Sequence, residues 1–228
     1  YHAAKIYIAR LLRCGKKIAI CEQISLPIGG KGLAERKVIE VITPGTAVEE
    51  EYLEQGANNY LAALCAVKED KGKIKLSFSY IDVSTGDFFA TSWDMENLEE
   101  KLLNELGRSN PRELVVAKSL YQNQLVRKAL ESYPSLSVTF EEDWHFSQET
   151  GYKRLLAQFG TTNLRSFSLL ETSPEVSSAG YLIEYVLRTT AFSSEEHRLP
   201  HVTNLQVYTD DNYVIIDDAS RRNLEITS

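Results

Sequence analysis

The sequence is short of positive charge and of long apolar runs, and each shortage excludes a class of protein. Its 25 Lys and Arg residues stand against 32 Asp and Glu, a formal net charge of -7. A strong nucleic-acid binder needs a basic surface that neutralises phosphates, so the chain taken as a whole does not have that character. No apolar run reaches membrane length and no secretory signal opens the chain, so we expect no membrane segment.

Cysteine is also scarce, with three residues at unrelated spacings, Cys14, Cys21 and Cys65. This spacing indicates neither a disulfide framework nor a paired zinc site, and it suits a reducing compartment. We expect each cysteine to be a small buried apolar residue. The length of 228 residues, with 43% apolar side chains, is enough for one or two domains with real cores.

The N-terminal stretch reads as half of a small α/β domain. Apolar residues at helical spacing predict a helix over 1–14, closed by Gly15. Alternating patterns predict strands over 17–23 and 37–43. Basic residues outnumber acidic ones in this part, so any contact with DNA is expected here. The acidic stretch 49–56 is the expected linker to the next unit.

A second unit follows, with the pattern of an α/β fold. Three strands joined by short turns are expected first, at 60–67, 74–83 and 88–93. Helices are then expected at 95–106, 120–130, 147–159 and 174–190, and strands at 113–117 and 137–140. Asp94 is expected to cap the first of these helices, with Gly107 beyond its end. This order predicts a mixed sheet covered by helices.

The C-terminal stretch is expected to contain a hairpin and to begin a helix that the chain does not complete. Strands at 204–207 and 213–216 are expected to form a hairpin. Asp217 or Asp218 can then cap a helix whose apolar residues have nothing left in the chain to cover them. We therefore expect the chain to be a piece of a larger protein.

Two short motifs that suggest ligands are weak. The stretch Gly29-Gly30-Lys31-Gly32 lacks the spacing with which a phosphate-binding loop places its lysine and hydroxyl, so we expect a mobile loop. His197 and His201 have the spacing of a helical metal pair, but Pro200 between them disfavours a helix. Neither motif predicts a site.

Asp82 allows two interpretations. It lies in an apolar strand just before a turn, where a metal-dependent nuclease of the ribonuclease-H type would place its first carboxylate. Two-metal chemistry needs further carboxylates nearby, and Glu113 and Asp143 are unconvincing partners. In the second interpretation Asp82 ends the strand by accepting hydrogen bonds from the N–H groups of the turn 84–86.

Three collinear stretches resemble the MutS family of DNA mismatch-repair proteins. The segment 215–226, Ile-Ile-Asp-Asp-Ala-Ser-Arg-Arg-Asn-Leu-Glu-Ile, is similar to the start of that family's core domain. Tyr1-His2-Ala3 with Ala-Ile-Cys-Glu-Gln at 19–23, and Glu-Arg-Lys-Val at 35–38 leading to Thr-Pro-Gly-Thr at 43–46, resemble the last part of its mismatch-binding domain. Together they span the chain in the family's own order.

The resemblance implies a domain plan and a role. Residues 1–55 would be the C-terminal part of the mismatch-binding domain plus a linker, 56–200 the connector domain with a ribonuclease-H-like fold, and 201–228 the start of the core. The piece would be non-catalytic and cytoplasmic, coupling the DNA-reading and ATPase ends of its parent and offering a docking face to MutL. ATP and magnesium would belong to the parent, a homodimer, and no cofactor to this piece.

The resemblance also implies site residues. His2, Arg36 and Lys37 match positions near the duplex, while the Phe-x-Glu wedge that stacks on a mispaired base would lie upstream of Tyr1. Lys153 and Arg154 match positions on the connector face used by MutL, although the family often has uncharged polar residues there. Two alternatives remain open: a ribonuclease-H-like nuclease using Asp82, and a MutS relative that acts on recombination structures.

Overall fold

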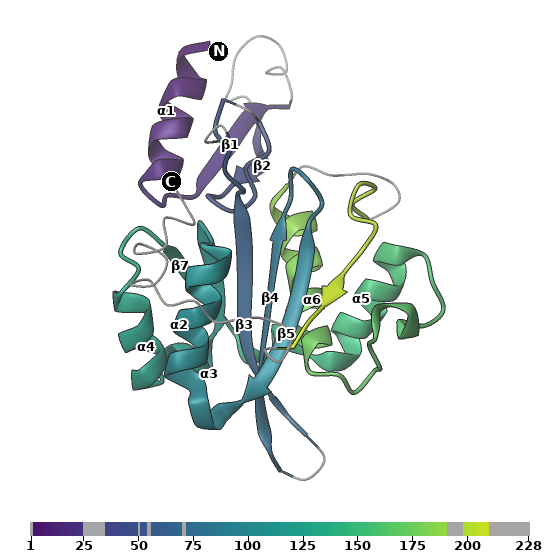
Figure 1. The fold of residues 1–228 in the computed structure, drawn as a ribbon. Coiled ribbons are helices and arrows are strands. Elements are labelled where there is room, and N and C mark those ends of the chain that lie inside the picture. The colour runs from purple at the N-terminus through teal and green to yellow at the C-terminus, as the bar shows by residue number, and fades with distance from the viewer. Residues whose placement is uncertain are drawn as a thin grey trace.

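The computed structural model describes residues 2–24, 35–49, 51–53, 56–69, 72–190 and 198–209. These residues form two sheets with helices packed on them (Figure 1). The predicted strand at 213–216, the helix start at 217–218, the glycine-rich stretch 29–32 and His197 lie outside the described residues. None of the described helices has the length and apolar character that crossing a bilayer requires.

The N-terminal part consists of one helix and a two-stranded antiparallel sheet. Helix α1 covers His2–Arg13, and strands β1 and β2 cover Ile18–Gln23 and Arg36–Ile42. Ala9 and Leu12 of α1 pack with Ile42 in a small core of their own. This arrangement confirms the predicted helix and both predicted strands.

The second part is built around a six-stranded mixed sheet in the order β7-β6-β3-β4-β5-β8. Its strands are β3 (Tyr60–Lys68), β4 (Ile74–Asp82), β5 (Phe88–Asp94), β6 (Glu113–Ala117), β7 (Ser137–Glu141) and β8 (Gln206–Val207). The first three are antiparallel to their neighbours in the chain, while β6, β7 and β8 join in parallel. An α/β fold with a mixed sheet is therefore confirmed.

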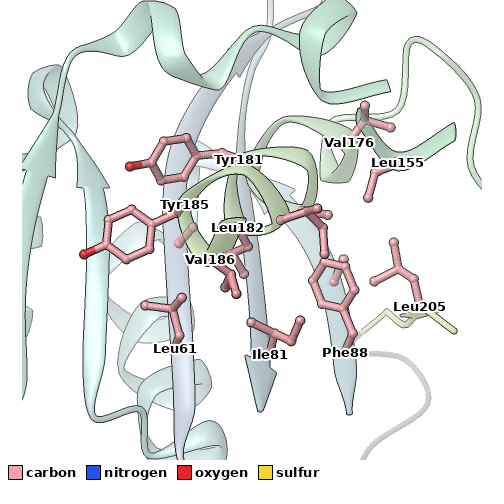
Figure 2. Close-up of a cluster of buried hydrophobic side chains, with 14 of the residues drawn as sticks. Leu61, Ile81, Phe88, Leu155, Val176, Tyr181, Leu182, Tyr185, Val186 and Leu205 are labelled. Atoms are coloured by element: carbon pink, nitrogen blue, oxygen red, sulfur yellow. The ribbon is translucent and has the colours of Figure 1, made fainter. Parts of the chain in front are cut away.

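Helices cover both faces of this sheet, because its central strands are apolar on both sides. On one face lie α2 (Leu98–Ser109), α3 (Lys118–Tyr121) and α4 (Gln124–Glu131). On the other lie α5 (Gln148–Phe159) and α6 (Glu175–Thr189). Figure 2 shows the second layer, in which α6 side chains such as Leu182 and Val186 lie over the strand residue Leu61.

Short polar residues allow α6 to lie close to the middle of the sheet. The Ser178 hydroxyl on α6 is 2.7 Å from the Ser77 hydroxyl and 2.6 Å from the Ser79 hydroxyl, both on β4. All three serines are buried, so each hydroxyl finds in this cluster the partner that burial requires. The helix is thereby held on the sheet by hydrogen bonds as well as by apolar packing.

Two predicted helix boundaries were wrong. The segment predicted as one helix begins with a 3-10 turn at Met95–Asn97, and Asp94 makes no side-chain capping bond. Gly107 lies inside α2, whose C-cap is Asn110 in the left-handed conformation with φ of 41°. Asparagine tolerates that conformation and can replace glycine as a C-cap. The helix predicted over 120–130 is broken at Asn123, whose side chain accepts from Leu125 N at 2.9 Å and caps α4.

The expectation that all three cysteines are buried needs correction. Cys14 and Cys21 are exposed, because they lie on the thinly covered N-terminal part; only Cys65 is buried. The stretch 204–207, predicted as the first strand of a hairpin, contains β8, which pairs in parallel with β5 of the six-stranded sheet; its predicted hairpin partner at 213–216 lies outside the described residues. That pairing places Gln206 and Val207 on the edge of the second part.

Candidate functional site at the junction of the two sheets

Glu113 is the central residue of the contact between the two parts. It is the first residue of β6 and is 0% exposed. Its carboxylate accepts hydrogen bonds from Tyr185 Oη at 2.6 Å and from Gly45 N at 3.1 Å. Lys17 Nζ lies 3.3 Å from the same carboxylate. A buried carboxylate needs such donors and a cation, and here two of the three come from the N-terminal part.

Lys17 and Tyr185 complete this group of contacts. Lys17, just before β1, donates to Tyr185 Oη at 2.7 Å, and its Nζ is 5.1 Å from the centre of the tyrosine ring. Burial raises the pKa of Tyr185, and the neighbouring Glu113 charge raises it further. The phenol therefore keeps its proton at neutral pH, and its O–H donates a hydrogen bond to Glu113. Hydrogen bonds therefore connect Lys17 of the N-terminal part to Tyr185 of α6, and Tyr185 to Glu113.

A buried loop forms the second contact of the junction. In this loop, 43–47, the hydroxyls of Thr43 and Thr46 are 2.9 Å apart. A Cβ on Gly45 would come within 2.8 Å of Leu61 Cβ, so only glycine lets the loop approach β3 this closely. Asn59 Nδ2 donates to the carbonyl groups of the loop at 3.0 and 3.2 Å. The loop is thus fastened to the start of β3 by both backbone and side chains.

Asp82 lies at the same end of the sheet, on the other side of β3. Its Oδ1 accepts from Ser84 N at 2.8 Å, Ser84 Oγ at 2.6 Å and Thr85 N at 3.3 Å. Its Oδ2 accepts from Asn59 N at 2.9 Å. The interpretation of Asp82 as the residue that ends the strand is confirmed, and the bond to Asn59 adds a link to the junction that the sequence did not predict.

The acids considered as partners for Asp82 are engaged elsewhere. Glu113 is flanked by Lys17 and Tyr185, and Asp143 accepts from Ser119 N at 3.1 Å. Across the residues that the structure describes, no three His, Cys, Asp or Glu side chains are grouped to hold a metal ion. His201 is bound to the backbone, with Nε2 2.6 Å from Val83 O.

The residues expected to approach DNA all lie on the N-terminal part. His2 is the first residue of α1. Arg36 and Lys37 are exposed on β2, opposite Gln23 and Glu22 of β1. The two basic residues are adjacent in the strand, so their side chains project to opposite faces of the ribbon. They therefore do not form a single basic patch.

The two residues expected to dock a partner, Lys153 and Arg154, are both on α5, but they lie in different surroundings. The Lys153 side chain is 71% exposed and bonds to Glu149 Oε1 at 2.5 Å, one turn earlier. Arg154 lies against α6, with Nη2 3.9 Å from Glu184 Oε2. Lys153 is thus available on the surface, whereas Arg154 takes part in the contact between helices.

Comparison with known proteins identifies the family. Residues 59–203 match the family model for MutS domain II, and residues 1–51 match the one for MutS domain I. The DNA mismatch repair protein MutS of Treponema denticola is 46% identical over 99% of this chain, and the proteins of that name from Treponema pallidum (strain Nichols) and Symbiobacterium thermophilum are 43% and 38% identical over 99% and 100% of it. The chain spans about a quarter of the length of these relatives, 25%, 24% and 25%. The chain belongs to the MutS family of DNA mismatch repair proteins.

Proposed function

We propose that this chain is the part of a mismatch-recognition ATPase that couples its DNA-reading end to the rest of the protein. The observation that carries the proposal is the pair of matches to MutS domains I and II along one chain. In the proposed plan, residues 1–55 end the mismatch-binding domain, 56–200 form the connector, and 201–228 begin the core. The connector's sheet, with three antiparallel strands followed by parallel ones, agrees with a ribonuclease-H-like fold.

Coupling would run through the junction at Glu113. Lys17 and the loop at Gly45 belong to the N-terminal part, and both bind the same carboxylate. Tyr185 connects that carboxylate to α6, the helix that packs along the connector sheet. A displacement of the N-terminal part would therefore act on a buried polar group, where broken contacts are costly.

His2, Arg36 and Lys37 are the proposed DNA contacts. Basic side chains on an exposed ribbon suit phosphates, which position a protein on DNA without reading its sequence. The chain itself is proposed to be non-catalytic, with ATP and magnesium bound by the longer cytoplasmic protein, a homodimer. A MutS relative acting on recombination structures would use the same connector, and mismatch-selective binding by the longer protein is the property that separates the two.

The proposed partner surface is α5, with MutL as the partner. Exposed Lys153 offers a charge at this surface, and Arg154 holds the helix beside α6. The test replaces Lys153 and Arg154 by Glu, singly and together, in the full-length protein, with Lys68→Glu/Lys73→Glu on the β3–β4 turn as the charge-matched control. Lys153→Glu is expected to weaken MutL recruitment while leaving mismatch binding and thermal stability unchanged.

The pattern among the variants decides the outcome. Arg154→Glu should lower stability as well, because it places a second carboxylate beside Glu184. If the Lys153→Glu variant and the control recruit MutL equally well, this face of α5 is ruled out as the docking surface. Loss of mismatch binding together with recruitment would mean that the substitution acts through the fold.

A further inference from the structure

Residues 198–209 cross the edge of the six-stranded sheet from one helical layer to the other. Leu199, Val202 and Leu205 are buried in the core shared with α5 and α6. Tyr208 is buried in the opposite core, the one that contains α2. In Figure 1 this yellow segment runs between α5 and β5. We refer to residues 198–209 as the strap.

Gln158 on α5 holds the first half of the strap. Its side chain is only 4% exposed. The amide nitrogen donates to Leu199 O at 2.7 Å and to Val202 O at 2.9 Å, and the amide oxygen accepts from Leu199 N at 2.9 Å. The Gln158 side chain thus makes hydrogen bonds to three backbone groups that lie outside any strand pairing. Because both the nitrogen and the oxygen of its amide are used, the strap is fixed relative to α5.

The middle of the strap rests on the β4–β5 turn. His201 Nε2 is 2.6 Å from Val83 O. A Cβ on Gly86 would lie 2.7 Å from His201 O, so the two backbones are in direct contact there. This contact leaves the strap little freedom to move independently of the turn.

The second half of the strap is held by β5 and α2. Strand β8 pairs with Phe89 and Ala90, and Tyr208 N donates to Ala90 O at 3.1 Å. Tyr208 Oη donates to the buried Glu105 on α2 at 2.6 Å. The Arg108 guanidinium carbon lies 3.9 Å from the centre of the Tyr208 ring and also pairs with Glu105. The buried Glu105 carboxylate and the partly exposed Arg108 therefore anchor Tyr208, near the end of the strap.

We infer that the strap is a single mechanical link between α5 and α2, through which a shift of α5 is carried to Tyr208 in the opposite helical layer. Gln158 and Tyr208 are its two positioning residues. Between these anchors Val202 and Leu205 are buried in the core shared with α5 and α6, so a shift of α5 would displace their side chains as well. Anything that displaces α5 would in this way act on α2 through Tyr208 and Glu105.

The test measures amide hydrogen exchange at both ends of the strap by NMR. Tyr208→Phe removes one hydroxyl and keeps the ring, so the chain is expected to fold. If the strap opens as one unit, this change should speed exchange of the Leu199 amide, at the α5 end, by about fivefold. Gln158→Leu should speed exchange of the Tyr208 amide, at the α2 end, by a similar factor.

A matched control excludes a general loosening of α2. Tyr133 Oη donates to Leu103 O at 3.1 Å, again onto α2 but away from the strap. Tyr133→Phe should leave exchange of the Leu199 amide unchanged. The inference is overturned if Tyr208→Phe speeds exchange only at its own end, or if Tyr133→Phe speeds exchange of the Leu199 amide as much. Because Tyr208→Phe and its control Tyr133→Phe together decide between these outcomes, the test holds even if Gln158→Leu fails to fold.

Discussion

Gly151 and Gly180 bring α5 and α6 into backbone contact, because neither residue has a Cβ to hold the helices apart. A Cβ on Gly180 would lie 2.2 Å from Gly151 Cα, and one on Gly151 would lie 2.4 Å from Val176 O. Both obstacles are backbone atoms, which a rotamer change cannot move. The position of α5, and with it the proposed partner surface, therefore depends on these two glycines.

Gly180→Ala is accordingly expected to destabilise the chain. Alanine favours a helix over glycine, so propensity alone predicts a gain of about 1 kcal/mol. Forcing the helices apart should outweigh that gain and leave a net loss of roughly 1–3 kcal/mol in unfolding free energy. Chemical denaturation measures the change. The matched control is Gly107→Ala in α2, whose Cβ would meet only Tyr133 Oη at 3.3 Å and should be nearly neutral.

The sequence predicted elements well where the pattern was local. Strand β6 was predicted with both ends correct, because its apolar run lies between Pro111 and a helical segment. The end of α2 was missed because Asn110 adopts the conformation that Gly107 was expected to provide. Whether the helix ends at Gly107 or at Asn110 depends on tertiary packing, which a local sequence pattern does not show.

The junction shows where sequence reasoning stops. Glu113 was considered only as a metal partner for Asp82, and Lys17 only as one of several basic residues. Pairing of β6 with β3 buries Glu113, and the fold then brings Lys17 to it. One signal was present: a charged residue at the start of a wholly apolar strand must find a cation if it is buried. The sequence around Glu113 does not show which cation that is, because Lys17 is distant from it in the chain.

The ion pair at the junction predicts an asymmetric effect of mutation. Lys17→Met should leave the Glu113 carboxylate buried with neutral donors alone. We expect it to lower the free energy of unfolding by roughly 2 kcal/mol, less than for a fully buried ion pair, because the Lys17 side chain is 35% exposed. Glu113→Gln removes the charge and should cost less. In the double variant no buried charge is left unpaired, so its loss should be smaller than the sum. Strict additivity in urea unfolding would contradict a coupled pair.

Alkaline pH should weaken the folded state through Tyr185. Its pKa is raised from 10.0, first by burial and then by Glu113. Below pH 10 both states are protonated, so this contribution is fully present. Above it the unfolded chain loses a proton that the folded chain keeps, and stability should fall by up to about 1.4 kcal/mol per pH unit for this tyrosine. Tyr185→Phe should make this fall of the unfolding free energy with pH shallower.

DNA binding by this chain is expected to be weak and to depend steeply on salt. A few lysines and arginines contacting phosphates release counterions, whereas the net charge of -7 opposes close approach. Replacing Arg36 and Lys37 by Glu should lower the affinity for every duplex alike and reduce the slope of log affinity against log salt by about 2. Fluorescence anisotropy at several salt concentrations measures both. A selective loss for mismatched duplex would contradict purely phosphate contacts.

Asp82 is expected to be a structural residue, and its substitution separates this role from catalysis. Asn at position 82 keeps one oxygen for the N–H groups of Ser84 and Thr85 but turns an NH₂ group toward Asn59 N, which is also a donor. Asp82→Asn should therefore cost about 1 kcal/mol of stability. Asp82→Ala, which removes every acceptor, should cost more. Wild type and both variants should cleave neither DNA nor RNA in magnesium or manganese. Cleavage by the wild type that disappears in a folded Asp82→Asn variant would instead make Asp82 a metal-binding carboxylate of a nuclease.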